Sequence, residues 1–185
     1  MLSTIKSGEA AARRDLRTQL VVERLTGRSA EDDYINDDMR RGIELEDDAR
    51  AAFESATGRV TRQTGFLRHD SLMVGCSLDG DIDDFREIVE LKVPRSATHW
   101  RYLREGSVPA EHVAQITHNL WVTGATACWF CSFDARFPEH LQTFVVRVER
   151  DEAAIEAYAA KALAFLDEVD RDVSVALGWR ALATA

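Results

Sequence analysis

The sequence predicts an α/β fold in which a central mixed β-sheet is flanked by helices. Helical periodicity marks both ends of the chain and the region after residue 95, and short runs rich in β-branched and aromatic residues lie between. Such an order of strands and helices is typical of a sheet with helices packed on it. The 185 residues suit one compact domain, so we expect a single domain over 1–185.

The first half of the chain predicts two helices and a hairpin. A helix over 8–26 and a longer helix over 33–56 each end at a Thr-Gly pair, because glycine readily terminates a helix. Strands over 59–66 and 71–77 are predicted to form a hairpin, and Asp79-Gly80-Asp81 has the composition of a turn.

The second half predicts further strands and helices. Residues 88–93 are rich in β-branched residues and are followed by Pro94, which ends the strand. The remaining predicted elements are helices over 96–105 and 109–123, strands over 126–133 and 142–149, and a last helix capped by Asp151.

The composition limits the possible function classes. Hydrophobic residues make up 45% and charged residues 30%, as in a globular protein. No apolar run approaches the roughly 20 residues that span a bilayer, and the N-terminus has no apolar signal core, so we expect a cytoplasmic protein without a membrane segment. The net charge of -9 is unfavourable for a polyanionic partner, but a local basic face leaves nucleic acid open.

The three cysteines, Cys76, Cys128 and Cys131, are expected to be free thiols because their number is odd. Cys128 and Cys131 form a CxxC pattern within an apolar, strand-like run, where residues three apart face opposite sides. No second Cys or His pair completes a zinc site, and an iron–sulphur cluster needs four thiolates. Buried small side chains are the better interpretation.

The segment that carries chemistry is Glu90-Leu91-Lys92. Glu90 and Lys92 are two apart on a strand and share a face, whereas Leu91 points to the other face. A carboxylate beside an ammonium can hold a divalent cation and orient an attacking water. A hairpin would bring Asp79 beside Glu90, which gives two carboxylates for one hard cation.

The alternative is a surface salt bridge on an edge strand. The strand is apolar around the pair, which favours a buried or cleft location. The chain has three lysines against twenty arginines, so a lysine here suggests a need for its titratable amine.

Two further polar residues are candidates. Glu46 falls in the apolar stripe of the 33–56 helix, where it needs a cation or hydrogen-bond partner unless it reaches solvent at the rim. Gln115 shares a polar strip with His112 and Asn119, which a solvated helix face explains equally well.

Four ordered stretches resemble the phage lambda exonuclease family, also called YqaJ-type viral recombinases, within the PD-(D/E)xK nuclease superfamily. The likeness runs from about residue 16 to 170. The stretches are Arg41–Arg50, similar to Gly-x-x-x-Glu-x-x-Ala-Arg; Cys76–Gly80, similar to Ser-Pro-Asp-Gly; Glu90–Pro94, similar to Glu-Leu-Lys-Cys-Pro; and Ala114–Gly124, similar to a Gln-containing helix.

The resemblance implies a restriction-endonuclease-like fold and a role for each matching residue. Asp79, Glu90 and the Leu91 carbonyl would hold Mg²⁺, for which Mn²⁺ would substitute. Lys92 would activate the attacking water, and Glu46 would assist at the metal.

Ser77 and Gln115 would contact the phosphate near the cleaved end. The family hydrolyses one strand of double-stranded DNA in the 5′-to-3′ direction during phage recombination in the bacterial host. Its members often form homotrimers and work with a single-strand annealing protein.

The chain departs from the family pattern in three ways. Leu78 replaces the usual proline, and the turn after Asp79 carries the extra acids Asp81, Asp83 and Asp84. Nothing matches the earlier family segment that grips the 5′-phosphate, so we expect this chain to lack the N-terminal end-binding segment.

Two alternatives remain open from the residues. One is another PD-(D/E)xK enzyme, an endonuclease or nickase with the same active site. The other is a non-catalytic remnant of the fold that binds DNA or a protein.

Overall fold

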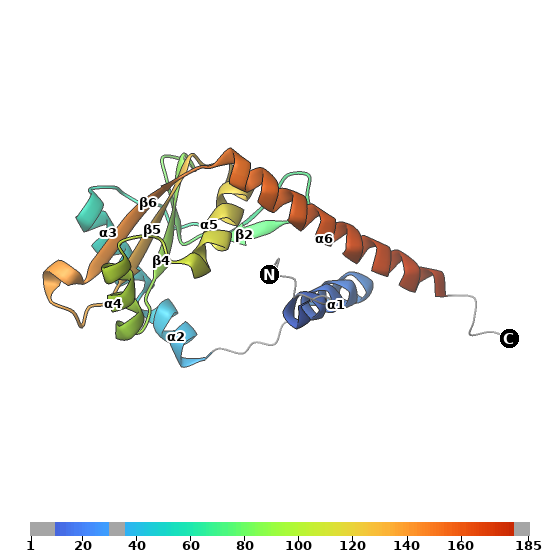
Figure 1. Cartoon of the computed structure of the whole chain (residues 1–185), viewed down its shortest axis with the longest axis horizontal. Coiled ribbons are helices and arrows are strands. Elements are labelled where there is room, and N and C mark those ends of the chain that lie inside the picture. The colour runs from blue at the N-terminus through green and yellow to red at the C-terminus, as the bar shows by residue number, and fades with distance from the viewer. Residues whose placement is uncertain (1–9, 30–35, 180–185) are drawn as a thin grey trace. The chain divides into compact units, whose positions relative to one another are not determined.

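A four-stranded mixed sheet lies at the centre of the unit formed by residues 35–158 (Figure 1). The computed structural model describes residues 10–29 and 36–179. The strands lie in the order β3 (Gly80–Ile82), β4 (Glu87–Lys92), β5 (Ala127–Phe133) and β6 (Thr143–Glu149). β4 and β5 are parallel, and the other two pairs are antiparallel, which confirms the predicted mixed sheet.

Helices cover both faces of this sheet. On one face α3 (Glu46–Thr57) packs through Ala49 and Phe53 onto alternate residues of β4. On the other face α4 (Ser96–Glu105), α5 (Ala110–Thr123) and the start of α6 (Glu152–Gly178) pack on Ile88 and Phe130. Because both faces are covered, β5 is buried along almost its whole length, as expected of a central strand.

The cysteines are buried free thiols, as the sequence predicts. Cys128 and Cys131 belong to the cores on opposite faces of the sheet. Burial raises the pKa of Cys131 to about 12, so this thiol stays protonated and unreactive near neutral pH.

A second unit comprises residues 1–34 and 159–185. In it α1 (Ala11–Thr26) is joined to the later part of α6 by charged contacts. Glu168 accepts hydrogen bonds from Arg13 at 2.8 and 2.9 Å and from Arg17 at 3.0 Å. The Arg13 guanidinium also lies over the Phe165 ring, 4.9 Å from its centroid. A fork of this kind orients two helices more firmly than single ion pairs do.

The predicted helix over 33–56 is wrong in one respect, because it breaks at Leu45 into α2 (Asp37–Glu44) and α3. Residues 33–35 lie outside the described part. Leu45 has φ -110° and ψ 9°, away from helical values. Acids occupy the first turn of α3, where the helix dipole favours them, so the sequence begins a new helix here. Met39 and Ile43, two apolar residues of α2, are consequently exposed.

The predicted hairpin and turn are also wrong in their bounds. The hairpin consists of β1 (Phe66–Arg68) and β2 (Gly75–Ser77), and residues 59–65 make one isolated bridge, between Arg62 and Asp81. Gly80 begins β3 and does not lie in a turn. The chain reverses four residues later, where three consecutive residues after Ile82 have positive φ. Asp81 is buried and accepts a hydrogen bond from the Phe85 amide, so its carboxylate stabilises this later turn.

The other predicted elements are confirmed within about two residues. They are β4, α4, α5, β5, β6 and α6, and a 3₁₀ helix, η1 (Glu139–Leu141), precedes β6. Asp151 accepts a hydrogen bond from the Ala154 amide at 3.1 Å, which is the predicted cap. None of the helices in the described part is both long enough and apolar enough to cross a membrane.

Candidate active site

β4 places Glu90 and Lys92 on the face covered by α5, and Leu91 on the face covered by α3. Glu90 is 1% exposed. One of its oxygens pairs with the Lys92 ammonium, and the other accepts a hydrogen bond from the Asn119 side-chain amide at 3.1 Å. A buried carboxylate with partners on both oxygens has a fixed orientation.

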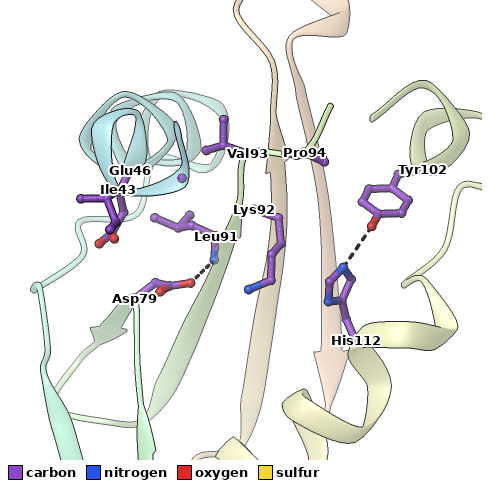
Figure 2. A pocket seen from close by; sticks show the side chains of 10 residues that line it. Ile43, Glu46, Asp79, Leu91, Lys92, Val93, Pro94, Tyr102 and His112 are labelled. Atoms are coloured by element: carbon purple, nitrogen blue, oxygen red, sulfur yellow. Dashed lines mark hydrogen bonds between the residues drawn. The ribbon is translucent and has the colours of Figure 1, made fainter. Parts of the chain in front are cut away.

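Asp79 reaches this site because β3 is short. β3 begins at Gly80, opposite Val89, so the ladder ends before it reaches Leu91. The Leu91 amide donates instead to Asp79 Oδ2 at 2.7 Å (Figure 2). The end of β3 thus brings the Asp79 carboxylate beside the Glu90-Leu91-Lys92 segment.

Glu90 and Asp79 are both harder to ionise at this site than in water. The pKa of Glu90 is raised to about 7, chiefly by burial; the Lys92 ammonium opposes this rise, and the negative charge of Asp79 adds to it. Burial also raises the pKa of Asp79, against the Lys92 charge and the Leu91 amide. A bound cation would offset this mutual repulsion, because it favours the charged form of both groups.

A pocket of about 310 Å³ opens above these residues. Asp79, Leu91 and Lys92 line one side, and Tyr102 and His112 line another (Figure 2). The remaining lining residues are Gly42, Ile43, Glu46, Val93 and Pro94. The Tyr102 hydroxyl and His112 Nε2 are hydrogen-bonded at 3.0 Å. Burial, followed by the Lys92 charge, lowers the pKa of His112, so its imidazole is neutral near neutral pH.

Glu46 is the first residue of α3 and lies at the rim of this pocket. Its side chain is one-third exposed and accepts a hydrogen bond from Arg50 at 2.8 Å. Both interpretations from the sequence therefore hold in part, since Glu46 reaches solvent and also has a partner. Arg50 Nε and Nη1 are buried and have no hydrogen-bond partner among the described residues. Arg50 Nη1 would lie 2.9 Å from a Cβ on Gly80, so the guanidinium occupies the space that a side chain there would need.

Ser77 and Gln115 are exposed, and neither lines the pocket. Ser77 lies in β2 opposite Phe66. Gln115 lies close enough to the Glu90 carboxylate to lower its pKa. Their expected contact with a substrate phosphate stays a prediction.

Asn119 and Arg50 are the site residues that sequence reasoning missed. Asn119 is buried at 2% exposure and holds Glu90. Its spacing of four from Gln115 on α5 is the signal that could have identified it, because such residues share one helix face. Arg50 follows Glu46 by one helical turn, which predicts an ion pair but not its closeness to Gly80.

The oxygen donors at this site suit a hard divalent cation. Within residues 10–29 and 36–179 no group of three or more acidic, histidine or cysteine side chains could hold a metal. The backbone offers a further oxygen beside Asp79 and Glu90. A residue in an extended strand directs its N–H and C=O to the same edge, so the Leu91 carbonyl faces the edge that Asp79 occupies.

Comparison with known proteins gives a consistent result. The family model of the YqaJ-like viral recombinase domain matches residues 5–126. The crystal structure of an alkaline exonuclease from Laribacter hongkongensis is similar, with 33% identity and a TM-score of 0.82 over 90% of this chain and 84% of that chain. Its complex with dAMP gives the same values. A phage-related exonuclease from Haemophilus somnus, 15% identical, shares the fold with a TM-score of 0.72 over 94% and 91% of the two chains. No curated protein matches significantly.

Proposed function

This chain belongs to the YqaJ-like viral recombinase family and is a phage-type DNA exonuclease, and from this premise we propose that it degrades one strand of duplex DNA from the 5′ end with Mg²⁺. The observation that carries the proposal is the convergence of Asp79, Glu90 and Lys92 beside one pocket. The partial resemblance to an exonuclease that binds dAMP supports a mononucleotide product.

Asp79, Glu90 and the Leu91 carbonyl would hold the cation. Mg²⁺, or Mn²⁺ in its place, would polarise the scissile phosphate and lower the pKa of water there. Lys92 lies against Glu90 and borders the pocket, so its ammonium can orient a water and stabilise charge on the phosphate oxygens. Glu46 at the rim would assist through water.

The reaction balances as a hydrolysis. The oxygen of one water bonds to phosphorus, the bond from phosphorus to the 3′ oxygen breaks, and that oxygen takes up a proton. The products are a 5′-mononucleotide and a strand shortened by one residue. Ser77 of β2 and Gln115 of α5 would contact the phosphate at the cleaved end.

Degradation of labelled DNA tests the proposal. We expect linear duplex DNA with a 5′-phosphate to be degraded from that end, with activity lost in EDTA and restored by Mg²⁺ or Mn²⁺. Lys92→Ala should lower kcat by about 10²- to 10⁴-fold. Lys161→Ala, at an exposed position of α6, is the matched control and should retain activity. Degradation of closed circles, or full activity of Lys92→Ala, would contradict the proposal.

We also propose that the enzyme acts in the host cytoplasm with a single-strand annealing protein and as a homotrimer. Support comes from the family alone. Light scattering of the purified chain measures the oligomeric state, and a stable monomer at micromolar concentration would exclude the trimer. Co-purification with an annealing protein from the same phage tests the partner.

A further inference from the structure

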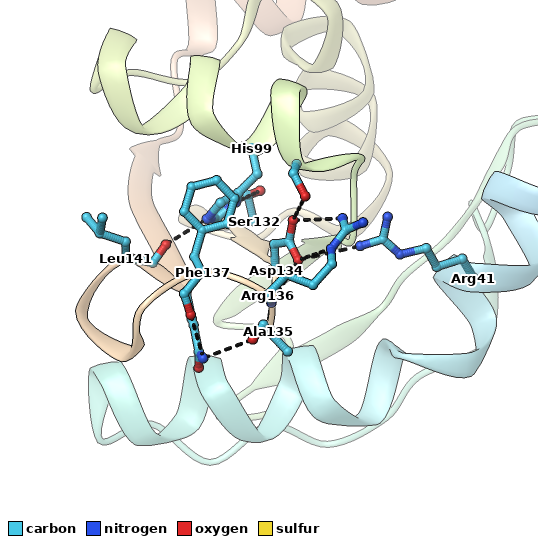
Figure 3. Close-up of polar contacts among 10 residues, drawn as sticks. Arg41, His99, Ser132, Asp134, Ala135, Arg136, Phe137 and Leu141 are labelled. Atoms are coloured by element: carbon cyan, nitrogen blue, oxygen red, sulfur yellow. Dashed lines mark hydrogen bonds and ion pairs between the residues drawn. The ribbon is translucent and has the colours of Figure 1, made fainter.

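Two arginines converge on one buried carboxylate near the pocket (Figure 3). Asp134 directly follows β5 and is 1% exposed. Arg136 donates to both of its oxygens, from Nε at 2.7 Å and from Nη2 at 2.8 Å. Arg41 of α2 lies with Nη2 3.7 Å from the same carboxylate, and Ser96 donates to it at 2.7 Å. One anion therefore gathers groups from three separate segments.

This cluster has more positive charge and more donors than Asp134 can satisfy. Two guanidinium groups face one carboxylate, which leaves a surplus of one positive charge. Arg41 lies beyond hydrogen-bond distance of Asp134, so its N–H donors are not used there. Arg136 uses two of its five N–H donors on the carboxylate, and its side chain is 56% exposed. The arrangement therefore presents a forked set of donors to a further anion.

Three paths along the chain connect the cluster to the pocket. Arg41 precedes Gly42, and Ser96 follows Pro94 by two residues; Gly42 and Pro94 both line the pocket. Asp134 lies two residues after Ser132, and Ser132 pairs in register with Lys92. Two extended residues span about 7 Å. This distance of about 7 Å corresponds to about two nucleotide steps along one strand of duplex DNA.

We propose that Arg41 and Arg136, held together by Asp134, bind a backbone phosphodiester of the DNA within a few nucleotides of the scissile phosphate. The proposal rests on the proposed function and adds a substrate-binding site to it. Guanidinium groups suit this role because their planar fork matches the oxygens of a phosphodiester. In a chain with a net charge of -9, a local positive site next to the pocket counteracts the overall repulsion of DNA.

The chain contains a matched control for this site. Arg62 donates to Asp81 at 2.9 and 3.1 Å, Asp81 is 1% exposed, and the Arg62 side chain is 58% exposed. Burial of the carboxylate and exposure of the arginine thus match those of Asp134 and Arg136, while Arg62 also donates to Asp84 at 3.1 Å. Asp81, however, pairs with Ile88, four residues before Lys92 on β4. The two pairs lie toward opposite ends of the sheet, and Arg62 does not line the pocket.

Fluorescence anisotropy of the full chain with labelled duplex DNA tests the proposal, with Ca²⁺ in place of Mg²⁺ to prevent turnover and with KCl varied between 50 and 200 mM. We expect Arg136→Gln and Arg41→Gln each to raise Kd about threefold to tenfold and to reduce the slope of log Kd against log salt by about one. Because both side chains bind one phosphate, the double variant should also lose about one in slope, not two. Arg62→Gln should bind like the wild type.

The outcomes separate this proposal from the proposed function. A wild-type chain that degrades duplex DNA, with Arg41→Gln and Arg136→Gln binding as tightly as the wild type, would overturn the proposal alone. An equal loss in Arg62→Gln would also overturn it, because charge anywhere on the surface would then account for binding. A wild-type chain that neither binds nor degrades duplex DNA would overturn both. If Arg136→Gln does not fold, Arg41→Gln decides, because Arg41 makes no hydrogen bond to Asp134.

Discussion

Replacing Glu90 by glutamine should stabilise the metal-free protein at alkaline pH. The pKa of Glu90 is about 7 in the folded chain, against 4.5 for an ordinary glutamate, so ionising it costs the folded state about 3 kcal/mol. Since the folded pKa is raised, the favourable contribution is present below pH 4.5 and is lost as the pH rises to 7. Glutamine is neutral and similar in shape, so it avoids this loss at every pH.

Thermal unfolding in EDTA at pH 5 and pH 8 measures the effect. At pH 8 we expect the Glu90→Gln variant to melt about 6–12 °C above the wild type, and at pH 5 the difference should shrink. Mg²⁺ should stabilise the wild type at pH 8 and should stabilise the variant much less. A variant that melts at or below the wild type at pH 8 would refute the reasoning.

Glu87 on the same strand is the control. Burial raises its pKa, but the Trp129 indole and the Arg147 guanidinium outweigh burial, so the net pKa is lowered. Its contribution is therefore present above the ordinary pKa and is lost as the pH falls. Glu87→Gln should destabilise the protein at pH 8, which is the opposite sign for the same substitution on one strand.

Further substitutions test the residues that hold the site. Asn119→Ala removes a hydrogen bond to the Glu90 carboxylate and should lower the free energy of unfolding, measured in urea at pH 8, by about 1.5–3 kcal/mol. Thr117→Ala on the same helix is the control and should lower it by less than about 0.5 kcal/mol. Equal losses in the two variants would contradict the role of Asn119. Gly80→Ala should cost about 1–3 kcal/mol because its Cβ meets Arg50 Nη1, and this cost should fall in an Arg50→Ala background; an additive double mutant would show that Arg50 is not the obstacle.

The sequence predicts the sheet well where strand and helix signals are strong and local. β4 is rich in β-branched residues and stops at a proline, and α5 and α6 have clear apolar periodicity. These signals depend only on neighbouring residues, so they persist in the folded chain. The face alternation of Glu90 and Lys92 is predicted for the same reason, because the two-residue period of a strand requires it.

The errors arise where tertiary contacts determine the structure. Asp79-Gly80-Asp81 has turn composition, yet Gly80 and Asp81 pair with β4 because Arg62 and Thr64 satisfy the buried Asp81 carboxylate. No local pattern indicates partners nearly twenty residues away. The break at Leu45 is comparable, since the acids that begin α3 were also compatible with a continuous helix.

Asn119 and Arg50 escape sequence reasoning because polar residues in a helix face are usually solvated. The structure distinguishes them by burial. The Asn119 amide points at a carboxylate that has few other partners, and Arg50 lies between Glu46 and Gly80. α3 and α5 pack on opposite faces of the sheet, and this packing directs Arg50 and Asn119 toward the region where β3 and β4 stop pairing. The sequence alone does not show this packing.

The position of the site follows from the place where the pairing of β3 with β4 stops, which is Gly80 opposite Val89. Two more pairs in the register would set Asp79 opposite Glu90 and Leu78 opposite Leu91, and would use both backbone groups of Leu91 in the ladder. Instead the Leu78 amide donates to the Gly65 carbonyl at 3.5 Å, and the Leu91 amide donates to Asp79. The usual proline at position 78 has no N–H to offer the ladder. Leucine achieves the same result by directing its N–H elsewhere, so the substitution leaves the Leu91 carbonyl free of β3 and available to a cation.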